Sequence, residues 1–498
     1  MLRDMNVHDT AAPAALNRAD TADLVKRVVG PVSLPADAGY QSECGTFNLM
    51  SAVRPAIAVG ATSVADLQAA VRFAAERDLP VAVLATGHQM VRSAEGAVLI
   101  NMSRMNAVHV DPGRSLARVE GGTRWHRVLD EADKYGLAPL SGSSPTVGVV
   151  GYHLGGGASP ILGRAHGYAA DHIQAIEIVT ADGELRRVAA SSEPDLFWAL
   201  RGGKGNFGVV TTLEFSLFPV KRFYGGGLFF AGEYAAKVLH AWREWVVDLP
   251  TETSSSMAFL RMPPLPMVPE PLRGTFVMHV RFSSLQPQEE AERLLAPIRE
   301  IAPTVLDTIT WLPYREAGSV FMDPPVPVPW VDRGTMLRDL PGEAADVLIS
   351  MLGPDSGTEL GFVELRPLGG ALEHPPVVPN AVPGRSARWS LYGVGGGQPD
   401  LAPVFQEQLS TLVNALAAWA QEEKSPNLLS ATQGTTPEEM RAIYGLERYD
   451  RLAAIKKQYD PRNLFRMNHN ITPIRSNNNH TQGSKAPTHV RGPERLKR

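Results

Sequence analysis

The segment Gly203-Lys-Gly-Asn-Phe-Gly208 constrains the fold of this chain more than any other, because it has the G-x-G-x-x-G spacing in an unusual context. A Rossmann dinucleotide site needs a strand, then the glycine turn, then a helix whose N-terminus meets the phosphate. Here a helical pattern over 194–200 precedes the glycines and an alternating strand pattern over 209–218 follows them. No acidic residue stands about 20 residues further on, where the ribose contact is expected. The order excludes a Rossmann site and indicates glycines that let the backbone approach a neighbour or a cofactor.

A second glycine-rich segment runs from Ser143 to Gly157 and ends in three consecutive glycines. Backbone N–H groups without covering side chains can cradle phosphate oxygens as an anion nest. The alternative is a tightly packed loop.

His88 lies on a turn directly after an apolar run, Val81–Ala85, that is typical of a buried strand. A histidine in a tight loop next to a glycine can hold a ligand, transfer a proton or carry a covalent cofactor. The alternative is an ordinary loop residue.

Composition excludes several function classes. The chain has 498 residues, which suggests two or three domains, and a net charge of -4 gives no electrostatic footprint for nucleic acid. No apolar run reaches about 18 residues, and the first residues contain no apolar signal-peptide core, so we expect no membrane span and a cytoplasmic protein. Cys44 is the single cysteine, which excludes an intramolecular disulfide, and we expect no metal site. Nothing in the sequence indicates the oligomeric state.

The pattern changes near residue 223. Before it, helix and strand signals alternate: a helix capped at Ser63 and ending near Asp78, and a hairpin over 173–188 with Asp182-Gly183 at its tip. After it, amphipathic helices are predicted over 234–247, 289–301, 343–351 and 401–421, and strands over 275–282, 358–365 and 387–393. This mixture predicts one antiparallel sheet covered by helices.

Four segments together resemble a known family. They are Thr86-Gly-His88, the stretch Ser144–Gly157, the stretch Ala199–Thr211, and Tyr459-Asp-Pro-Arg-Asn-Leu-Phe-Arg-Met-Asn-His-Asn-Ile471 near the end. In order and spacing they are similar to the PCMH-type FAD-binding domain of the vanillyl-alcohol-oxidase superfamily, and more narrowly to the berberine-bridge-enzyme-like oxidases.

The resemblance implies an α+β fold in which a two-subdomain FAD-binding unit is joined to a substrate domain of antiparallel sheet covered by helices. The implied division is an N-terminal lead-in (1–53), an FAD-binding domain (54–220), a substrate-binding domain (221–440), a C-terminal segment returning to the FAD domain (441–475) and a disordered tail (476–498).

The resemblance also implies the chemistry. In this family a ring nitrogen of the histidine at the His88 position is bonded to the flavin 8α-methyl carbon, which retains the cofactor and raises its reduction potential. Flavin N5 takes hydride from a substrate C–H bond, and O2 reoxidises the flavin to give hydrogen peroxide. The implied cofactor-binding residues are Thr86, Gly87, His88, Gln89, Met90, Ser143, Ser144, Thr146, Val147, Gly148, Gly151, Tyr152, Gly155, Gly156, Val210, Asn468 and Asn470.

Two departures from the family pattern matter. Some relatives have a second flavin link, to C6, from a cysteine at the position of Ser144, so a single link through His88 is expected here. Many relatives also place a catalytic tyrosine where this chain has Ser425. A serine hydroxyl has a far higher pKa and is a poor substitute for a tyrosinate base. Either another group accepts the substrate proton, or the substrate needs no proton acceptor.

Four residues are candidates for catalysis. Tyr152 and His153 lie beside the glycines and are alternatively packing residues. Tyr392, in a predicted strand, points into the substrate pocket or packs in the core. Glu364 acts as a base or pairs with Arg366.

The leading hypothesis is therefore an FAD-dependent oxidase of a small or medium-sized organic molecule, such as a secondary metabolite or a sugar, that uses O2. The alternatives are a dehydrogenase of the same fold that uses another acceptor, and a catalytically silent flavin-binding protein.

Overall fold

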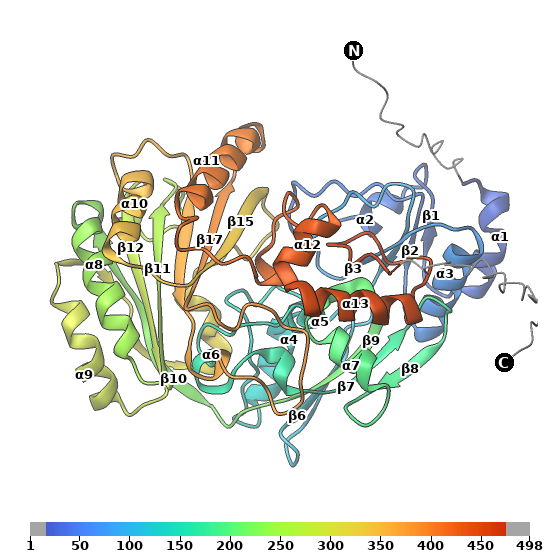
Figure 1. The fold of residues 1–498 in the computed structure, drawn as a ribbon, viewed down its shortest axis with the longest axis horizontal. Coiled ribbons are helices and arrows are strands. Elements are labelled where there is room, and N and C mark those ends of the chain that lie inside the picture. The colour runs from blue at the N-terminus through green and yellow to red at the C-terminus, as the bar shows by residue number, and fades with distance from the viewer. Residues whose placement is uncertain (1–15, 475–498) are drawn as a thin grey trace, which may run out of the picture.

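Three β-sheets organise residues 16–474, which are the residues that the computed structural model describes (Figure 1). The smallest sheet has the order β1-β2-β4-β3, in which β2 and β3 both run parallel to β4. Its strands are β1 (Val32–Ser33), β2 (Ile57–Gly60), β3 (Val81–Leu84) and β4 (Val98–Asn101). All residues of β2 and β4 are buried, as their unbroken apolar runs require.

The helix that leads into β3 forms for reasons that the sequence shows. The Ser63 hydroxyl accepts a hydrogen bond from the backbone N–H of Asp66 and caps α3 (Val64–Glu76). The helix stops just before Asp78, whose φ of 57° is left-handed. The predicted cap and end are confirmed, and β3 then carries the chain to the turn with His88.

The second sheet is antiparallel, with the order β5-β6-β9-β7-β8. Its strands are β5 (Val108–Asp111), β6 (Leu116–Glu120), β7 (Ile173–Val179), β8 (Leu185–Val188) and β9 (Val209–Ser216). The predicted hairpin is the pair β7 and β8, with Gly183 at its tip in a left-handed conformation. The helices of this half are α1 (Arg18–Arg27), α2 (Tyr40–Glu43), α3, α4 (Trp125–Asp133), α5 (Val149–Leu154), α6 (Gly163–His166) and α7 (Pro194–Leu200).

The third sheet has eight strands, and all of its strand pairs are antiparallel. The order is β13-β10-β12-β11-β16-β17-β15, with β14 paired to β10. The strands are β10 (Arg222–Ala231), β11 (Thr253–Arg261), β12 (Phe276–Ser284), β13 (Thr304–Asp307), β14 (Thr310–Pro313), β15 (Trp330–Leu337), β16 (Phe362–Pro367) and β17 (Trp389–Gly396).

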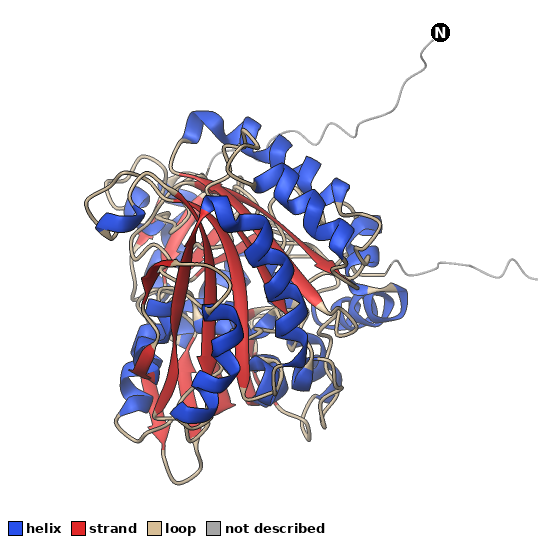
Figure 2. Ribbon diagram, turned by 90° about the vertical axis from the view of Figure 1, so that its left-hand side faces the viewer, coloured by secondary structure: helices blue, strands red, loops and turns tan. Residues whose placement is uncertain are grey.

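Helices cover one face of this sheet, as predicted (Figure 2). They are α8 (Ala235–Trp245), α9 (Gln288–Arg299), α10 (Gly342–Leu352) and α11 (Ala402–Ala415). Alternate residues of a strand point to opposite faces. On β16, Val363 and Leu365 pack in the core under the helices, so Glu364 lies on the other face, where it borders a cavity.

Two predicted elements are shorter than expected. The strand expected over 358–365 begins only at Phe362, because Gly357 takes a left-handed turn and the Thr358 hydroxyl bonds to Gln408. The helix expected over 401–421 ends at Ala415, after which the chain turns back and Trp419 accepts a hydrogen bond from the N–H of Arg338. The expected disorder of residues 476–498 lies outside the described residues.

The chain ends by returning to its first half. Helices α12 (Pro437–Tyr444) and α13 (Leu446–Tyr459) lie beside the smaller sheets, as the red ribbon in Figure 1 shows. Lys456, on α13, is fully buried, and its ammonium donates to the carbonyls of Asn206 and Phe465 and lies 3.3 Å from Asp460. The Asp460 carboxylate accepts the N–H groups of Leu464 and Phe465. The Lys456 ammonium, paired with Asp460, therefore links the C-terminal segment to the glycine loop before β9 through the Asn206 carbonyl.

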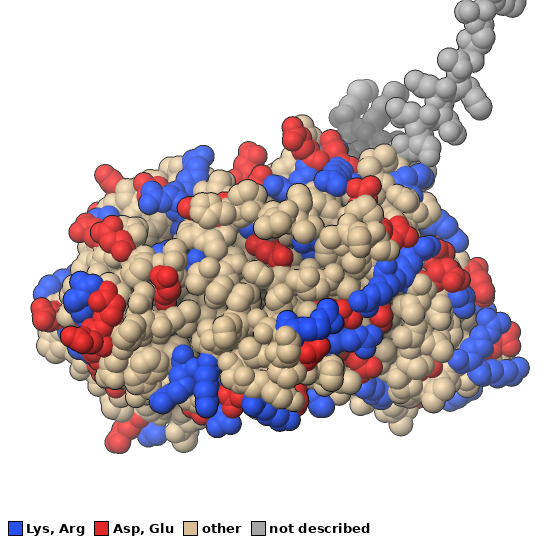
Figure 3. Space-filling model, turned by 90° about the horizontal axis from the view of Figure 1, so that it is seen from below, with Lys and Arg blue, Asp and Glu red and all other residues tan. Residues whose placement is uncertain are grey.

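Two properties of the surface of the described residues concern partners: a membrane span and patches of charge. No helix among residues 16–474 has the length and apolar character needed to cross a membrane. On the face shown in Figure 3, acidic and basic side chains are interspersed.

Replacing Lys456 by methionine tests this attachment. Lys456→Met leaves the Asp460 carboxylate and the two carbonyls buried without their cation, which costs about 3–5 kcal/mol. We expect the free energy of unfolding, measured by urea titration with circular dichroism, to fall by that amount. Lys457→Met, one residue further along the helix, is the control and should change it by less than about 0.5 kcal/mol. Equal stability of the two variants would contradict the assigned role.

Candidate active site

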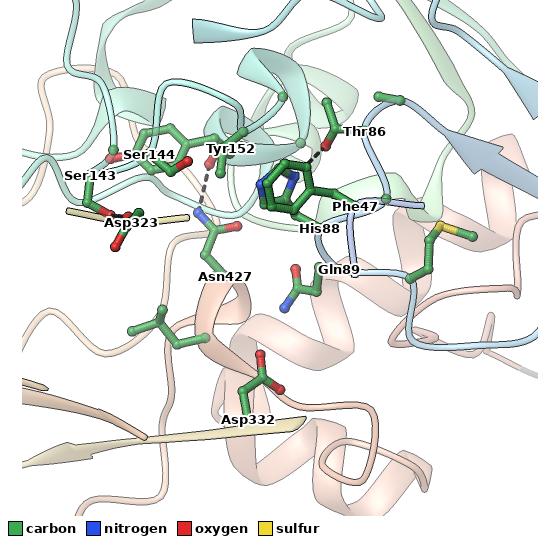
Figure 4. A pocket seen from close by; sticks show the side chains of 18 of the residues that line it. Phe47, Thr86, His88, Gln89, Ser143, Ser144, Tyr152, Asp323, Asp332 and Asn427 are labelled. Carbon is green, nitrogen blue, oxygen red and sulfur yellow. Dashed lines mark hydrogen bonds between the residues drawn. The ribbon is translucent and has the colours of Figure 1, made fainter. Parts of the chain in front are cut away.

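A cavity of about 730 Å³ lies between the two halves of the chain and receives side chains from both (Figure 4). One wall comes from the turn after β3, the segment 142–154 and the glycine loop before β9. The other wall comes from strands β11, β12, β15, β16 and β17 of the large sheet. Its volume is within the range of small-molecule and cofactor sites.

His88 borders this cavity, and both of its ring nitrogens have a partner. Nδ1 lies 3.0 Å from the Thr86 hydroxyl oxygen and Nε2 lies 3.2 Å from that of Thr146. The ring stacks on Phe47 with the centroids 3.9 Å apart. Burial, with a smaller contribution from the charge of Arg124, lowers the pKa of His88 to about 3. The imidazole is therefore neutral at pH 7 and is held in one orientation.

The Ser144 hydroxyl extends this network, because its oxygen lies 2.8 Å from that of Thr146. Ser143 also borders the cavity, and its hydroxyl donates to the Asp323 carboxylate across the two halves. The predicted residues Thr86, Gly87, Gln89, Met90, Val147, Gly148, Gly151, Tyr152 and Val210 border the cavity as well. Thr146 does not border it and reaches it through His88.

The triple glycine, predicted to cradle phosphate, lies where the two halves of the chain pack together. Gly155 and Gly156 are outside the cavity wall. A Cβ atom at Gly155 would be 2.0 Å from the Asn427 amide oxygen, and one at Gly156 would be 3.2 Å from Val382. Both glycines allow close packing of the second half against the first, and their contact with the cofactor remains a prediction.

Tyr152 and His153, neighbours on α5, have different surroundings. Tyr152 borders the cavity, but its hydroxyl is buried and has no hydrogen-bond partner among the described residues; burial raises its pKa well above the ordinary value. His153 is 1% exposed, lies against the rings of Trp125 and Phe215, and bonds through Nδ1 to the Val149 carbonyl. Of the two roles considered for His153, this geometry favours the packing role.

The C-terminal segment contributes Asn468, whose amide donates to the carbonyls of Gly205 and Phe465 while other atoms of the residue border the cavity. Asn470 is not part of the cavity wall, so its predicted contact with the cofactor is not supported.

On the large sheet, Glu364 is a paired carboxylate. Its two oxygens accept hydrogen bonds of 2.8 Å from the guanidinium groups of Arg281 and Arg366. These two cations keep its pKa below the ordinary value although burial opposes them. Of the two roles considered for Glu364, the geometry favours the ion pair.

Tyr392 has a different partner. Its hydroxyl donates to the Asp332 carboxylate at 2.5 Å, and both residues border the cavity. Burial raises the pKa of Asp332, and burial together with the Asp332 charge raises that of Tyr392 well above its ordinary value.

Several residues of the cavity wall were not predicted from the sequence. They are Phe47, Lys204, Arg281, Asp323, Trp330, Asp332 and Asn427. Lys204 carried a readable signal, since it is a long cationic side chain inside a glycine loop. Asp332 and Arg281 had none, because their positions depend on the pairing and register of distant strands.

The residues present fit an FAD molecule. A Cβ atom added at Gly151 would find no heavy atom within 4 Å, so this part of the wall leaves open space. Hydroxyl, amide and amine groups of Thr86, Gln89 and Lys204 suit the polar edges and the negative charge of FAD, and Val147 and Val210 suit its apolar ring systems.

Comparison with known proteins identifies two domains of the chain. Residues 55–189 match the model of an FAD-binding domain, and residues 433–472 match the model described as berberine and berberine-like. The chain therefore has an FAD-binding domain and a berberine-like C-terminal segment, and its relatives are FAD-linked oxidoreductases. Its PCMH-type fold and its enzyme class agree with the expectations from the sequence.

Some relatives match this chain over nearly their whole length. It is 28% identical to (R)-6-hydroxynicotine oxidase of Paenarthrobacter nicotinovorans over 90% of this chain and 97% of that protein. The structure of 6-hydroxy-D-nicotine oxidase from Arthrobacter nicotinovorans superposes with a TM-score of 0.77 at 25% identity, covering 90% of this chain and 98% of that one. A chitooligosaccharide oxidase has the same fold, with a TM-score of 0.78 at 19% identity over 92% of this chain and 100% of that one.

The open space at Gly151 gives a test of the cofactor site. Gly151→Leu places a side chain in the cavity without disturbing α5, because leucine is the better helix former. We expect the purified variant to contain far less FAD, measured by absorbance at 450 nm, with an unchanged far-UV spectrum. Gly361→Leu, which is also open at its Cβ but lies outside the cavity wall, is the control. Full FAD content in Gly151→Leu would place the cofactor elsewhere.

Proposed function

We propose that this oxidoreductase is an oxidase of a small or medium-sized organic molecule and that it carries its FAD on His88. When bound, FAD takes a hydride from a substrate C–H bond at N5 and passes the electrons to O2, giving hydrogen peroxide. The observation that supports the proposal most strongly is the neutral, oriented imidazole of His88 in the wall of an FAD-sized cavity.

The contacts of His88 suit covalent attachment. A neutral imidazole has a free electron pair on one nitrogen, and the hydroxyls of Thr86 and Thr146 can each donate or accept, so either tautomer is satisfied. Stacking on Phe47 keeps the ring from turning away. Ser144 has no thiol, and Cys44 is buried outside the cavity wall, so the second link found in some relatives has no attachment point.

His88→Ala tests the link. In wild-type protein precipitated with acid, we expect the yellow flavin to stay with the polypeptide, and intact mass to show one FAD per chain. In His88→Ala the fold should persist while the flavin passes into the acid supernatant. His109→Ala removes an exposed histidine of β5 and should behave as wild type. Flavin that is extractable from wild type would refute attachment through His88.

A proton acceptor for the substrate is available although Ser425 replaces the tyrosine of many relatives. Tyr392 is a neutral phenol that donates to Asp332. We propose that its oxygen accepts the proton of a substrate hydroxyl or amine while its own proton moves to the Asp332 carboxylate. Positioned acid–base groups of this kind contribute about 10²–10⁴-fold to rate.

Tyr392→Phe should therefore lower kcat by about 10²–10⁴-fold while FAD content stays the same. The wild-type kcat/KM should rise with pH through the pKa of Asp332, which is raised by burial, because the acceptor is the carboxylate form. Stopped-flow flavin reduction measures both. Tyr135→Phe, at an exposed tyrosine, is the control. Unchanged flavin reduction in Tyr392→Phe would exclude this route.

The substrate and the electron acceptor are open to direct measurement. Relatives include proteins named as nicotine, carbohydrate and chitooligosaccharide oxidases, so a panel of amines, sugars, alcohols and phenols is the rational screen. Peroxide release with O2 consumption supports an oxidase. Flavin reduction without O2 consumption indicates the dehydrogenase, and no reduction by any compound indicates a silent binding protein.

A further inference from the structure

Lys204 enters the cavity from the loop between α7 and β9, in the short turn η2 (Lys204–Asn206). Its backbone φ is 58°, a left-handed conformation that disfavours residues with a Cβ atom. Glycines flank it on both sides, so the loop could place a glycine here without strain. The side chain at this position therefore calls for an explanation.

The partners of the Lys204 ammonium are neutral. Nζ donates to the Gln89 amide oxygen at 2.6 Å and to the Asn427 amide oxygen at 2.8 Å. No carboxylate of the described residues contributes to its pKa; burial alone lowers it, to about 7. Lys456 shows the contrast, because that buried ammonium lies 3.3 Å from Asp460.

The titratable groups around Lys204 do not compete with it near neutral pH. Burial lowers the pKa of His88 to about 3 and those of His153 and His469 to about 4, and it raises that of Tyr152. The remaining facing groups have ionic partners: Lys456, whose pKa burial lowers to about 8, lies against Asp460, and the exposed Asp195 of α7 pairs with Arg451. Lys204 is the group of this set that changes charge between pH 6 and 9 without an acidic partner.

Its position places it near the proposed flavin ring. Gln89, which holds the ammonium, directly follows His88, the proposed attachment residue. Asn427 links the same ammonium to the Tyr152 carbonyl on the cavity wall. An amine without an acidic partner here would stabilise the negative charge that reduction places on a bound flavin, because charge interactions are strong in a buried site.

We propose that Lys204 is the counter-charge for flavin reduction: as two electrons pass from substrate to flavin, the Lys204 amine binds one proton from solvent, and the resulting ammonium raises the reduction potential. The inference rests on FAD occupying the cavity, as proposed above. By linkage, reduction and protonation favour each other, so the two-electron potential falls more steeply with pH above the oxidised-state pKa of the amine than below it.

The experiment is an anaerobic measurement of the flavin midpoint potential against reference dyes between pH 6 and 9. Wild type should take up one more proton per two electrons above about pH 7 than Lys204→Met does. At pH 6 the variant should have the lower potential, and it should bind sulfite, which adds to electron-poor flavin, on the order of tenfold more weakly. Lys237→Met, at an exposed lysine of α8, is the control and should match wild type.

The outcomes separate the two proposals. A wild-type protein that binds no flavin refutes the proposed function itself. Bound flavin with the same potential and pH slope in Lys204→Met and wild type refutes only the role of Lys204. Loss of FAD from the variant, with an unchanged potential in the loaded fraction, also refutes it and assigns the lysine to the diphosphate. The wild-type slope alone is a second test, since a constant slope across pH 7 excludes the proton uptake.

Discussion

The buried side chain of Asn206 is the point on which the cavity depends. Its amide donates to the carbonyls of Gly203 and His469, its oxygen accepts the N–H of Ile471, and its own carbonyl accepts the Lys456 ammonium. The glycine loop and the end of the chain are thereby held together across 250 to 265 residues of sequence. Lys204 and Asn468, which flank this junction on either side, border the cavity as a result. A buried polar network of this kind is stabilising only when every member has a partner.

Burial also determines the chemistry that the cavity can perform. Desolvation disfavours charge, so His88 is a neutral imidazole and Tyr392 is a neutral phenol. The same effect makes Lys204 an amine that changes charge near neutral pH, whereas Glu364 stays ionised because two arginines surround it. One wall therefore has a nucleophilic ring nitrogen and a titratable amine, and the opposite wall has a phenol–carboxylate pair. Substrate between these walls would meet the flavin on one side and the proton acceptor on the other.

The sequence predicts what is local. The cap at Ser63, the hairpin of β7 and β8, the turn with His88 and the wrong order of the glycine motif for a Rossmann site all follow from neighbouring residues. The positions of residues that meet from distant parts of the sequence do not follow from neighbouring residues. Tyr392 and Asp332 are sixty residues apart and meet only because β15 pairs with β17 in one register. His153 packs in the core because one residue along a helix turns a side chain by about 100° from the direction of Tyr152. The triple glycine is ambiguous in sequence because close packing and anion binding select the same residue.

The central claim is that this cavity holds FAD bonded to His88, and peptide mapping tests it most directly. Trypsin cleaves after Arg77 and Arg92, so His88 lies on the peptide 78–92, whereas Ser144 lies on the peptide 135–164. After acid precipitation and digestion of the wild-type protein, flavin fluorescence and the mass of one flavin adduct should be found on the peptide 78–92 alone. A flavin adduct on any other peptide, or flavin found entirely in the acid supernatant, would contradict this claim.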